Sequence, residues 1–558
     1  MVIKQQKLIR IALFIGALVL LNVAAQYFYT RIDFTKEKRY TLTAKSKEIL
    51  KNIKQPITIT VFLEGDLPAP FKRLRNATKD LLADYKAESG QEIKVIFKDP
   101  VSGLSIADQD TVINHLYEAG IEPTTINIKN DAGFAQKMVF PMAMLESPDR
   151  QLPVKLLQNL GATGSYEENI NNSIQNLEYL FTSAIQKVLS ADHPRIGFTE
   201  GNGELPDLML NDAITSLSDS YEVGRVNLST IDAAGLDKLK TLIIAKPQKE
   251  FTEAEKYKIN YFVMKGGRVV WAIDQVSADL DSLKGSGEQL AFNKKLNLDD
   301  MLFMYGARVN YNLIADANCA EIPLSMGTNG QIEMAPWVYY PLMKPDTSHN
   351  LVKNIDVLKG EFVSTVDTIA VKGLKKTVIL HSSPFNKIFN APKLLSLQMV
   401  AEQPDPRAYA SVPQALAVLI EGSFPSVFLN RSVPAGITGS YPLPAQSKPT
   451  KMVVIGDGDV FKNQISSKDG SVFPLGFDRY TQKNYGNKAL LLNIADYLSN
   501  DDHLIALRNK EVKIRLLDKA KLRIEKLQWQ LINMALPLLL LISFAIFQHY
   551  YRKHKYAR

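Results

Sequence analysis

The stretch that decides the fold runs from residue 241 to residue 274 and reads TLIIAKPQKEFTEAEKYKINYFVMKGGRVVWAID. Its two ends are rich in β-branched and apolar residues, which predicts strands over 241–245 and 268–273. Between them, Thr252 and Glu255 form a capping box that predicts the start of a helix. Gly266-Gly267 predicts the end of that helix after Lys265. Strands that alternate with helices in this way predict a doubly wound α/β sheet.

Outward from this stretch, further strands are expected on both sides. Arg195–Thr199 reads as an earlier strand, and Leu416–Glu421 and Met452–Ile455 read as later strands of the same body. We therefore predict one large α/β domain over residues 193–503. Prolines and scattered polar residues interrupt the interval 320–410, which we expect to be irregular or inserted.

Acidic side chains follow several of these strands and mark a candidate ligand-binding edge. Asp274 ends the first stretch, Asp457 and Asp459 follow the last strand in IGDGD, and Glu204 ends the glycine-rich EGNGE that follows the first strand. Ligands usually bind at the carboxyl edge of an open α/β sheet. Paired carboxylates there could hold a cation or perform acid–base chemistry. The alternative is a set of tight turns in which Asp and Gly satisfy the local backbone.

A smaller α/β domain is expected over residues 31–150. It begins with a helix at 44–53, a strand at 57–63, a helix at 70–88 and a strand at 93–97. This order predicts a parallel strand pair with a right-handed crossover. A helix at 112–119 and strands at 125–129 and 137–145 would complete a thioredoxin-like domain that lacks the redox motif C-x-x-C. Residues 151–192 are predicted to connect the two domains through an amphipathic helix over 166–190.

The charge is distributed as in a membrane protein. The chain has 558 residues, enough for about three or four domains, and a net charge of +8. Residues 1–10 hold three Lys or Arg and residues 548–558 hold four, whereas 31–530 together carry only +1. These two basic tails lie beside uncharged apolar runs. The pattern disfavours a nucleic-acid-binding surface, and we predict no nucleic-acid partner.

Two apolar segments are predicted to cross the membrane. The first covers residues 11–29, whose nineteen residues would span about 28 Å as a helix. A cleaved signal peptide is the alternative, because Val23-Ala24-Ala25 resembles a cleavage region. The second covers residues 531–547, flanked by Trp529 and by Tyr550-Tyr551 as interfacial anchors.

A basic amphipathic helix is predicted over 504–530, directly before the second membrane segment. Its apolar residues recur at steps of three and four and would form a seam. This seam would pack on its own domain, on lipid headgroups or on a partner helix. It consists of Leu517, Ala520, Ile524, Leu527 and Leu531.

The topology follows less directly from the charges. Three Lys or Arg precede the first segment and four follow it, whereas six precede the second segment within residues 511–528 and four follow it. Charge counting alone therefore slightly favours a cytoplasmic body. Long domains cross membranes despite their charges, and a short basic N-terminus is typical of an export signal. We expect both tails in the cytoplasm, two helices in the inner membrane and the main body in the periplasm.

Recognisable catalytic apparatus is missing from the sequence. It contains no G-x-x-x-x-G-K-[ST] phosphate loop, no G-x-S-x-G elbow and no H-E-x-x-H zinc motif. Its one cysteine, Cys319, excludes an intramolecular disulfide, and its histidines are not at ligand spacing. We therefore predict no cofactor, no metal cluster and no catalytic residue.

Four motifs carry a resemblance to a known family. They are DFTKEKRYTL at 33–42, IEGSFPS at 420–426, IGDGD at 455–459 and YGNK at 485–488. In this order and spacing the chain resembles, over essentially its whole length, the GldG family. Its members are gliding-motility-associated auxiliary, or substrate-binding, components of ABC transporters of Bacteroidetes.

The resemblance implies a non-catalytic subunit that docks on an ABC permease driven by a separate cytoplasmic ATPase. It also implies that 193–503 is an amidotransferase-like domain without the nucleophile, of a kind shared with an intraflagellar-transport protein. It supplies no catalytic residues and no transported substrate. Two other functions remain open: a membrane-anchored hydrolase that uses Asp274, Asp457 or Asp459, and a glycan-binding scaffold.

Overall fold

The structure is a computed structural model that divides into two compact units, residues 1–510 and 511–558, which are described separately. Of the predicted first membrane segment, 11–29, only Phe14 and Gly16 belong to the described residues, so that prediction lies outside them. The structure describes Phe14, Gly16 and residues 41–90, 93–130, 133–157, 166–189, 193–326, 331–353, 355–401, 406–439, 441–499 and 519–556.

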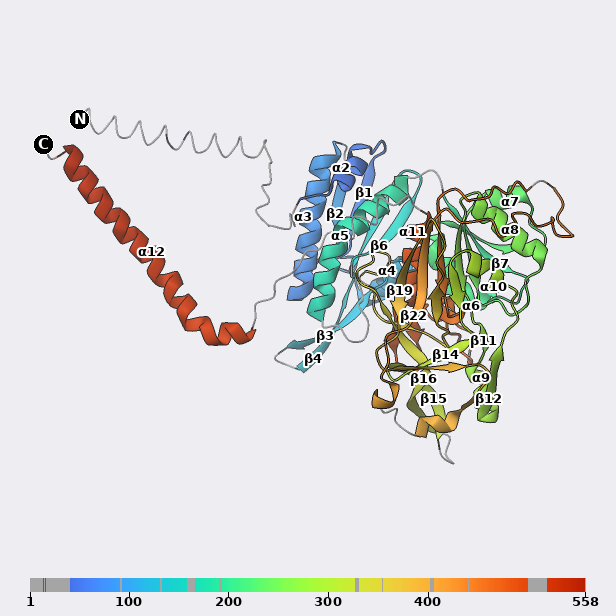
Figure 1. Cartoon of the computed structure of the whole chain (residues 1–558). Coiled ribbons are helices and arrows are strands. Elements are labelled where there is room, and N and C mark those ends of the chain that lie inside the picture. The colour runs from blue at the N-terminus through green and yellow to red at the C-terminus, as the bar shows by residue number, and fades with distance from the viewer. Residues whose placement is uncertain are drawn as a thin grey trace. The chain divides into compact units, whose positions relative to one another are not determined.

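The N-terminal part of the first unit is built on a β-α-β unit (Figure 1). β1 and β2 pair in parallel with Ile57 opposite Ile93, as the sequence predicts. Gly90 ends the connecting helix α3 at a φ of +58°, a left-handed conformation that glycine adopts without steric cost. The elements are α2 (Ala44–Lys51), β1 (Ile57–Val61), α3 (Ala69–Ser89), β2 (Ile93–Phe97) and α4 (Ile106–Glu118).

Two antiparallel strands complete this sheet, in the order β2-β1-β5-β6. The single strand predicted at 137–145 is divided in the structure, because Pro141 has no N–H to donate to a continuing ladder. The part before the proline pairs with the preceding strand in a separate hairpin. The strands are β3 (Thr124–Asn130), β4 (Gly133–Val139), β5 (Met142–Glu146) and β6 (Gln151–Lys155).

The segment 151–192 does more than connect two domains. β6 pairs with β5, so the sheet continues past residue 150. Helix α5 (Tyr166–Leu189) lies beside α3 (Figure 1). Leu177, Phe181 and Ile185 are buried in the same core as β1, because apolar residues at helical spacing line one face of α5.

The larger part of the first unit is built around a sheet in the order β15-β16-β19-β22-β23-β10-β9-β7-β8, with β17 paired to β16. The strands β8, β7, β9, β10 and β23 are parallel to one another. β22 and β19 then continue the sheet in antiparallel fashion. The parallel part is formed by β7 (Arg195–Glu200), α6 (Asp207–Ser218), β8 (Glu222–Asn227), α7 (Ala233–Asp237), β9 (Leu239–Ala245), α8 (Glu253–Met264), β10 (Arg268–Ala272) and β23 (Thr450–Ile455).

Helices cover both faces of this sheet, as expected for a doubly wound fold. Alternate residues of a strand point to opposite faces, so one apolar run serves two cores. Ile243 and Val270 belong to one core with α6 and α11 (Asn487–Ser499). Ile244 and Trp271 belong to the other, with α8. The predicted capping box is present, since Thr252 Oγ1 accepts from the N–H of Glu255, whose side chain accepts in return.

The interval 320–410 contains regular structure where the sequence predicts irregularity. Its main element is a hairpin of β15 (Cys319–Met326) and β16 (Gln331–Pro345). Prolines 323, 336 and 341 lie inside these strands, and proline normally argues against a strand interior. β15 lies at the end of the sheet, where a missing N–H is tolerated, and a register shift interrupts the ladder near Cys319.

Shorter strands and helices complete the body. They are β11 (Val276–Ser277), α9 (Leu280–Ser286), β12 (Glu288–Asn293), α10 (Asp299–Met304), β13 (Ala307–Val309), β14 (Asn312–Asp316), β17 (Leu358–Lys359), β18 (Val366–Thr368), β19 (Leu374–His381), β20 (Asn386–Asn390), β21 (Lys393–Ser396), η1 (Leu397–Ala401), η2 (Pro406–Tyr409), β22 (Ala415–Gly422), η3 (Asp459–Phe461), β24 (Phe477–Asp478) and β25 (Lys483–Asn484).

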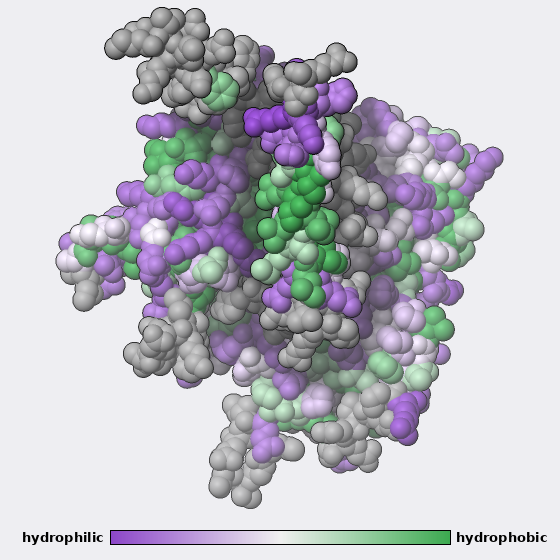
Figure 2. Space-filling model, turned by 90° about the vertical axis from the view of Figure 1, so that its left-hand side faces the viewer, coloured by the Kyte–Doolittle hydropathy of each residue, from purple (hydrophilic) through white to green (hydrophobic). Residues whose placement is uncertain are grey.

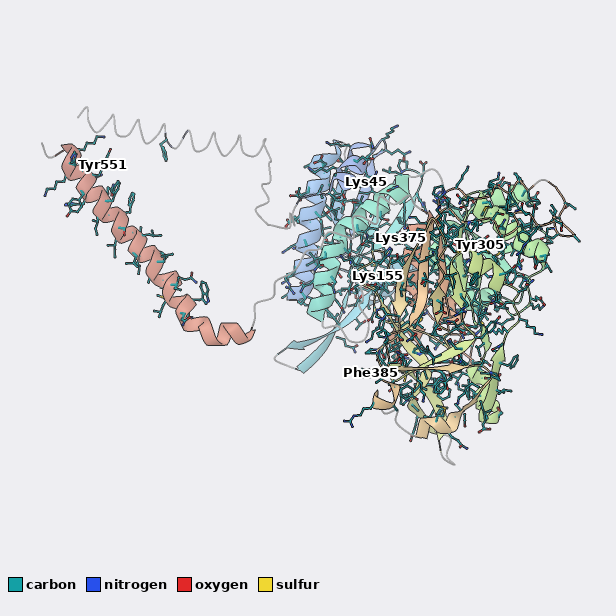
Figure 3. The ribbon with its side chains drawn as sticks, viewed as in Figure 1. Lys45, Lys155, Tyr305, Lys375, Phe385 and Tyr551 are labelled. Atoms are coloured by element: carbon teal, nitrogen blue, oxygen red, sulfur yellow. The ribbon has the colours of Figure 1, made fainter. Side chains whose placement is uncertain are left out.

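The second unit contains one long helix, α12 (Lys519–Tyr556). Within it, residues 528–555 have the length and hydropathy to cross a membrane, and none of the apolar window is buried in the protein. Figure 2 shows the hydrophobic middle of this helix between hydrophilic ends. Tyr551, labelled in Figure 3, lies near its C-terminal end and is exposed. Where the sequence predicts two helices, 504–530 and 531–547, the described part from residue 519 is one continuous helix.

Candidate functional site

The candidate site lies at the point where the strand order of the parallel part of the sheet reverses. In order of the chain, its parallel strands are arranged 2-1-3-4-5, so the connections leave β7 and β9 towards opposite sides. Such a switch point opens a crevice beyond the carboxyl ends of the two strands, where ligands of doubly wound sheets bind. Here the loop after β7 contains Gly203 and Glu204, and Lys246 directly follows β9.

Three carboxylates meet at this edge. Asp274 follows β10, and Asp457 and Asp459 follow β23; one oxygen from each lies within 4.8 Å of the others. The backbone around them is crowded. A Cβ on Gly456 would lie 2.0 Å from the carbonyl oxygen of Ser364, and one on Gly458 would lie 3.0 Å from Cγ of Asp274. The glycines of IGDGD therefore allow the close approach that brings the carboxylates together.

Lysines neutralise this acidic group from several sides. The ammonium of Lys246 contacts Asp459 and lies 3.5 Å from Oδ2 of Asp274. Nζ of Lys294 lies 3.6 Å from the same Asp274 oxygen. Nζ of Lys462 lies 2.6 Å from Asp459 Oδ1 and 2.6 Å from Oε2 of Glu361.

The backbone also binds these carboxylates. The N–H groups of Asp459 and Glu361 donate to the two oxygens of Asp457, at 2.8 and 3.1 Å. The N–H of Gly458 donates to Asp274 Oδ1 at 2.5 Å. Lys246 itself has a φ of +55°, a strained backbone for a residue with a side chain, and strain of this kind clusters at functional sites.

The same surroundings shift the pKa values of Asp457 and Asp459 in opposite directions. Burial raises the pKa of Asp457 well above its ordinary value, and the neighbouring Asp274 and Asp459 add to the rise. Burial acts in the same sense on Asp459, but Lys462 and Lys246 outweigh it and hold the pKa of Asp459 below its ordinary value. With Asp457 neutral, four carboxylates (Asp274, Asp459, Glu361 and Asp478) face four ammonium groups (Lys246, Lys294, Lys359 and Lys462).

This balance decides what the cluster can do. A cation held by the three aspartates would have to displace the ammonium of Lys246 from Asp274 and Asp459. Acid–base catalysis on a substrate would need the carboxylates to face an open space, and of the three only Asp459 lines the adjacent cleft. The geometry fits a neutral, rigid floor beneath a binding site better than it fits a reaction centre.

A cleft of about 510 Å³ lies above this floor. The loop after β7, Lys246 and the residues after β23 form one side of it, and α9 and the β15–β16 hairpin contribute further wall. Its charged lining residues are Glu204, Lys246, Asp279, Asp281, Lys284, Glu321, Lys359, Glu361, Asp459, Lys462, Asp478 and Arg479. Carboxylates therefore outnumber basic groups around the cleft.

All four residues of the predicted ligand-binding edge lie at this end of the sheet. Glu204 and Asp459 line the cleft, whereas Asp274 and Asp457 are buried beneath it. The turn interpretation of Asp457 also applies, because both its oxygens accept backbone hydrogen bonds. The sequence analysis did not include Lys246 in the site, although Lys246 directly follows the predicted strand 241–245, as Asp274 follows the strand 268–273. It also missed Glu361, which lies in the interval that the sequence left without structure.

The predicted partner seam is described only in part. Leu517 lies outside the described residues, and Ala520, Ile524 and Leu527 belong to α12 without described side chains. Leu531 is exposed on α12. The seam therefore stays a prediction.

Comparison with known proteins gives two matches to protein families. The sequence profile of a family described as an ABC-type uncharacterized transport system matches residues 193–494. A domain of unknown function, DUF7088, matches residues 36–146. The first match includes every residue named above as lining the cleft or forming its floor.

Similar individual proteins add little about function. A Borreliella burgdorferi protein described as uncharacterized is 21% identical over 513 residues, which cover 89% of this chain and 88% of that protein. The N-terminal domain of mmIFT52 covers 55% of this chain and 98% of its own, with 12% identity and a TM-score of 0.31. A putative ThuA-like protein from Bacteroides uniformis covers 56% of this chain and 95% of its own, with 11% identity and a TM-score of 0.26.

Proposed function

Because the chain belongs to the auxiliary ABC transporter family, we propose that it is a non-catalytic subunit of an ABC transport system and binds a ligand in the cleft of its central domain. The match over residues 193–494 is the observation that carries this proposal. A family of this kind implies a permease and an ATPase as partners in general. The missing phosphate loop agrees with an ATPase on a separate chain.

The anchoring of the chain supports the same role. The apolar residues of α12 are exposed, as expected for a helix that lipid or a permease covers. We propose that the main body is periplasmic and that residues 11–29 form a second anchor. Motion driven by ATP in the cytoplasm would then reach the body through membrane helices.

The finer identity is also a proposal. The four motifs at 33–42, 420–426, 455–459 and 485–488 support a GldG-type component of gliding motility. The strand order β2-β1-β5-β6 supports a thioredoxin-like N-terminal domain, and the parallel order 2-1-3-4-5 supports the amidotransferase-like assignment of residues 193–503. The hydrolase hypothesis receives less support, because lysines and backbone N–H groups already bind its three aspartates.

Co-purification from detergent tests the proposal. Tagged full-length protein should bring down a permease and an ATPase from solubilised membranes of the source organism. A variant with Leu539→Arg and Leu540→Arg, which places two charges in the middle of α12, should lose both partners, although residues 11–29 would still hold it in the membrane fraction. Recovery of the unsubstituted chain without either partner, or ATP hydrolysis by the chain alone, would refute the proposal.

Protease treatment of spheroplasts tests the topology. A periplasmic body should be degraded while the membrane stays sealed, and a cytoplasmic marker protein should survive. An intact body under these conditions would place it in the cytoplasm instead. Loss of surface spreading in a strain without the chain would test the role in gliding.

A further inference from the structure

Two of the five basic groups that line the cleft have no carboxylate partner in the described part of the chain. Lys246, Lys359 and Lys462 each form ion pairs with carboxylates. Lys284, on α9, and Arg479, which directly follows β24, form none. Lys284 is exposed, whereas Arg479 is half-buried. Arg479 therefore brings a partly enclosed positive charge to the cleft that the chain does not neutralise.

The chain does hold the guanidinium of Arg479 in place. Its Nη1 donates to the carbonyl oxygen of Ile465 at 2.7 Å, and its Nη2 donates to the hydroxyl of Tyr480 at 2.5 Å. Its Cζ also lies 4.6 Å from the centre of the Tyr480 ring. A guanidinium has five N–H donors in a rigid fork, so donors remain for a ligand. One of them is the N–H at Nε, which has no hydrogen-bond partner among the described residues and is not enclosed by protein.

A further donor lies beside this guanidinium. Oε1 of Gln464, another lining residue, accepts from the backbone N–H of Arg479 at 3.0 Å. The amide NH₂ of Gln464 is thereby left without a partner among the residues that the structure describes, and it is not enclosed. Arg479 and Gln464 together present donors, and no acceptor that is still free, to one part of the cleft.

Tyr340, on β16, adds a buried hydroxyl to the lining. The residue is only 4% exposed, and its hydroxyl makes no hydrogen bond within the described ranges. The hydroxyl of the neighbouring Tyr339 is enclosed by protein, but that of Tyr340 is not, so it opens into the cleft. A buried hydroxyl of this kind calls for a hydrogen-bonding group on a ligand.

The acidic residues of the lining are mostly bound by the chain itself. Ion pairs with lysines hold Glu321, Glu361, Asp459 and Asp478. Backbone N–H groups donate to Glu204 and Asp279. The seventh acidic residue, Asp281, is exposed, and solvent screens its charge. These contacts reduce the repulsion that a negatively charged group beside Arg479 would meet.

A doubly charged phosphate fits the cleft less well than a carboxylate does. In many doubly wound folds, backbone N–H groups after the first strand hold a phosphate at the start of the following helix. Here Glu204 occupies the N–H of Asn202, and Pro206, at the N-cap of α6, has no N–H to offer. The lining also has seven acidic against five basic residues, which disfavours a second negative charge on the ligand.

We propose that the cleft binds a small organic carboxylate whose carboxylate group accepts hydrogen bonds from the guanidinium of Arg479. This inference deepens the ligand-binding role proposed above and rests on it. The planar fork of a guanidinium matches a carboxylate, and hydrogen bonds between the two charges are about twice as strong as neutral ones. The amide of Gln464 supplies a donor next to Arg479, and the hydroxyl of Tyr340 can bind a polar group elsewhere on the ligand.

The walls of the cleft suit the rest of such a ligand. Leu205, Met209, Leu280, Ile322 and Pro323 give it apolar surface close to the charged groups. Its volume of about 510 Å³ lies within the range of small-molecule sites. The expected ligand therefore has a short apolar or aromatic part and one carboxylate.

Benzoate is a suitable probe, with benzamide as its neutral counterpart and phenyl phosphate as a doubly charged one. Binding of each to the full-length chain in detergent would be measured by saturation-transfer NMR and calorimetry at pH 7. The unsubstituted chain should prefer benzoate over benzamide by roughly tenfold, as expected for charge-assisted hydrogen bonds. It should bind phenyl phosphate more weakly than benzoate.

Arg479→Gln and Gln464→Glu test the proposed contact from two sides. The first removes the guanidinium. The second keeps an oxygen that accepts from the N–H of Arg479 but places a carboxylate beside the guanidinium. Both variants should lose the preference for benzoate over benzamide. Lys468→Gln changes the net charge by the same amount at an exposed position outside the lining, and it should keep the preference.

Gln464→Glu keeps the test decisive if Arg479→Gln does not fold, because it leaves the bonds of the Arg479 side chain in place. Equal binding of benzoate to the unsubstituted chain and to the folded site variants would overturn the inference. Tighter binding of phenyl phosphate than of benzoate would also overturn it, as would no binding of benzoate at about 10 mM, where even weak ligands bind. Because the probes need no permease, failure of the co-purification experiment would leave this result unaffected.

Discussion

The two α/β parts of the first unit both bury polar groups, but in different ways. In the N-terminal part, α2, α3 and α5 share a mostly uncharged cluster. The hydroxyl of Tyr85 donates to the carbonyl oxygen of Glu178 at 2.9 Å, and Ser46 Oγ donates to the Glu178 carboxylate at 2.8 Å. These bonds join helices to one another and lie within the core.

In the central part, the buried polar groups are charged, lie at the ends of strands and form the floor of a cleft. The difference teaches that burial of polar groups does not by itself identify a site. The informative feature is a cluster of bound charges that lies directly beneath an open cleft, as Asp274, Asp457 and Asp459 do. Four predictions test this contrast, beginning with the largest effect.

Lys246→Met should destabilise the central domain most, by about 3 kcal/mol, because it leaves Asp274 and Asp459 with one buried cation fewer. Unfolding is followed by the fluorescence of Trp271 and Trp337, both buried in this domain. Lys249→Met, an exposed neighbour, should change the free energy of unfolding by less than about 0.5 kcal/mol. Equal effects of the two substitutions would show that the buried cluster adds no special stability.

Asp457→Asn should change how stability depends on pH. The pKa of Asp457 is raised in the folded protein, so above pH 3.8 the folded state binds a proton that the unfolded state has lost. The free energy of unfolding then falls by about 1.4 kcal/mol per pH unit until the pH passes the folded pKa. The variant should lack this slope, measured by fluorescence-detected unfolding between pH 5 and 8.

Asp469→Asn is the control for that measurement. Hydrogen bonds from Ser466 and Ser471 lower the pKa of Asp469 to about 2. Its contribution is present above the unfolded pKa and is lost only as the pH falls towards 2, so the slope between pH 5 and 8 should be unchanged. An unaltered slope in Asp457→Asn as well would mean that Asp457 is ionised in the folded protein.

Tyr85→Phe should have an intermediate effect, confined to the N-terminal part. It removes a hydroxyl that is bound to the backbone of Glu178 and lies 2.5 Å from Thr182 Oγ1, at a cost of about 1–2 kcal/mol. Hydrogen exchange of the amides in α3 and α5 should accelerate, while that in α8 stays the same. Tyr117→Phe, on an exposed side chain, should change neither.

Lys284→Met should have the smallest effect on stability. This lysine lines the cleft but is exposed, so its removal should change the free energy of unfolding by less than about 0.5 kcal/mol. Melting temperatures of Lys284→Met and Lys246→Met, measured side by side, should therefore differ by several degrees. A large loss in Lys284→Met would show that the rim of the cleft, and not only its floor, stabilises the domain.

Local sequence signals were enough to predict the strand–helix–strand segments that build the parallel part of the sheet. The capping box at Thr252, the glycine pair at 266–267 and the apolar runs of β9 and β10 depend only on neighbours in the chain. The apolar middle of α12 was predictable for the same reason. So was the position of Asp274, Asp457 and Asp459 at one edge, since parallel strands align their carboxyl ends.

Tertiary structure alone decided how these acids are neutralised and which of them reach the cleft. Lys294, Glu361 and Lys462 come from separate loops, and Glu361 lies in the interval 320–410, where prolines in β15 and β16 concealed the strands. Whether a carboxylate ends in a turn, an ion pair or an open space depends on distances between segments that are far apart along the chain. A sequence contains the residue types but not those distances.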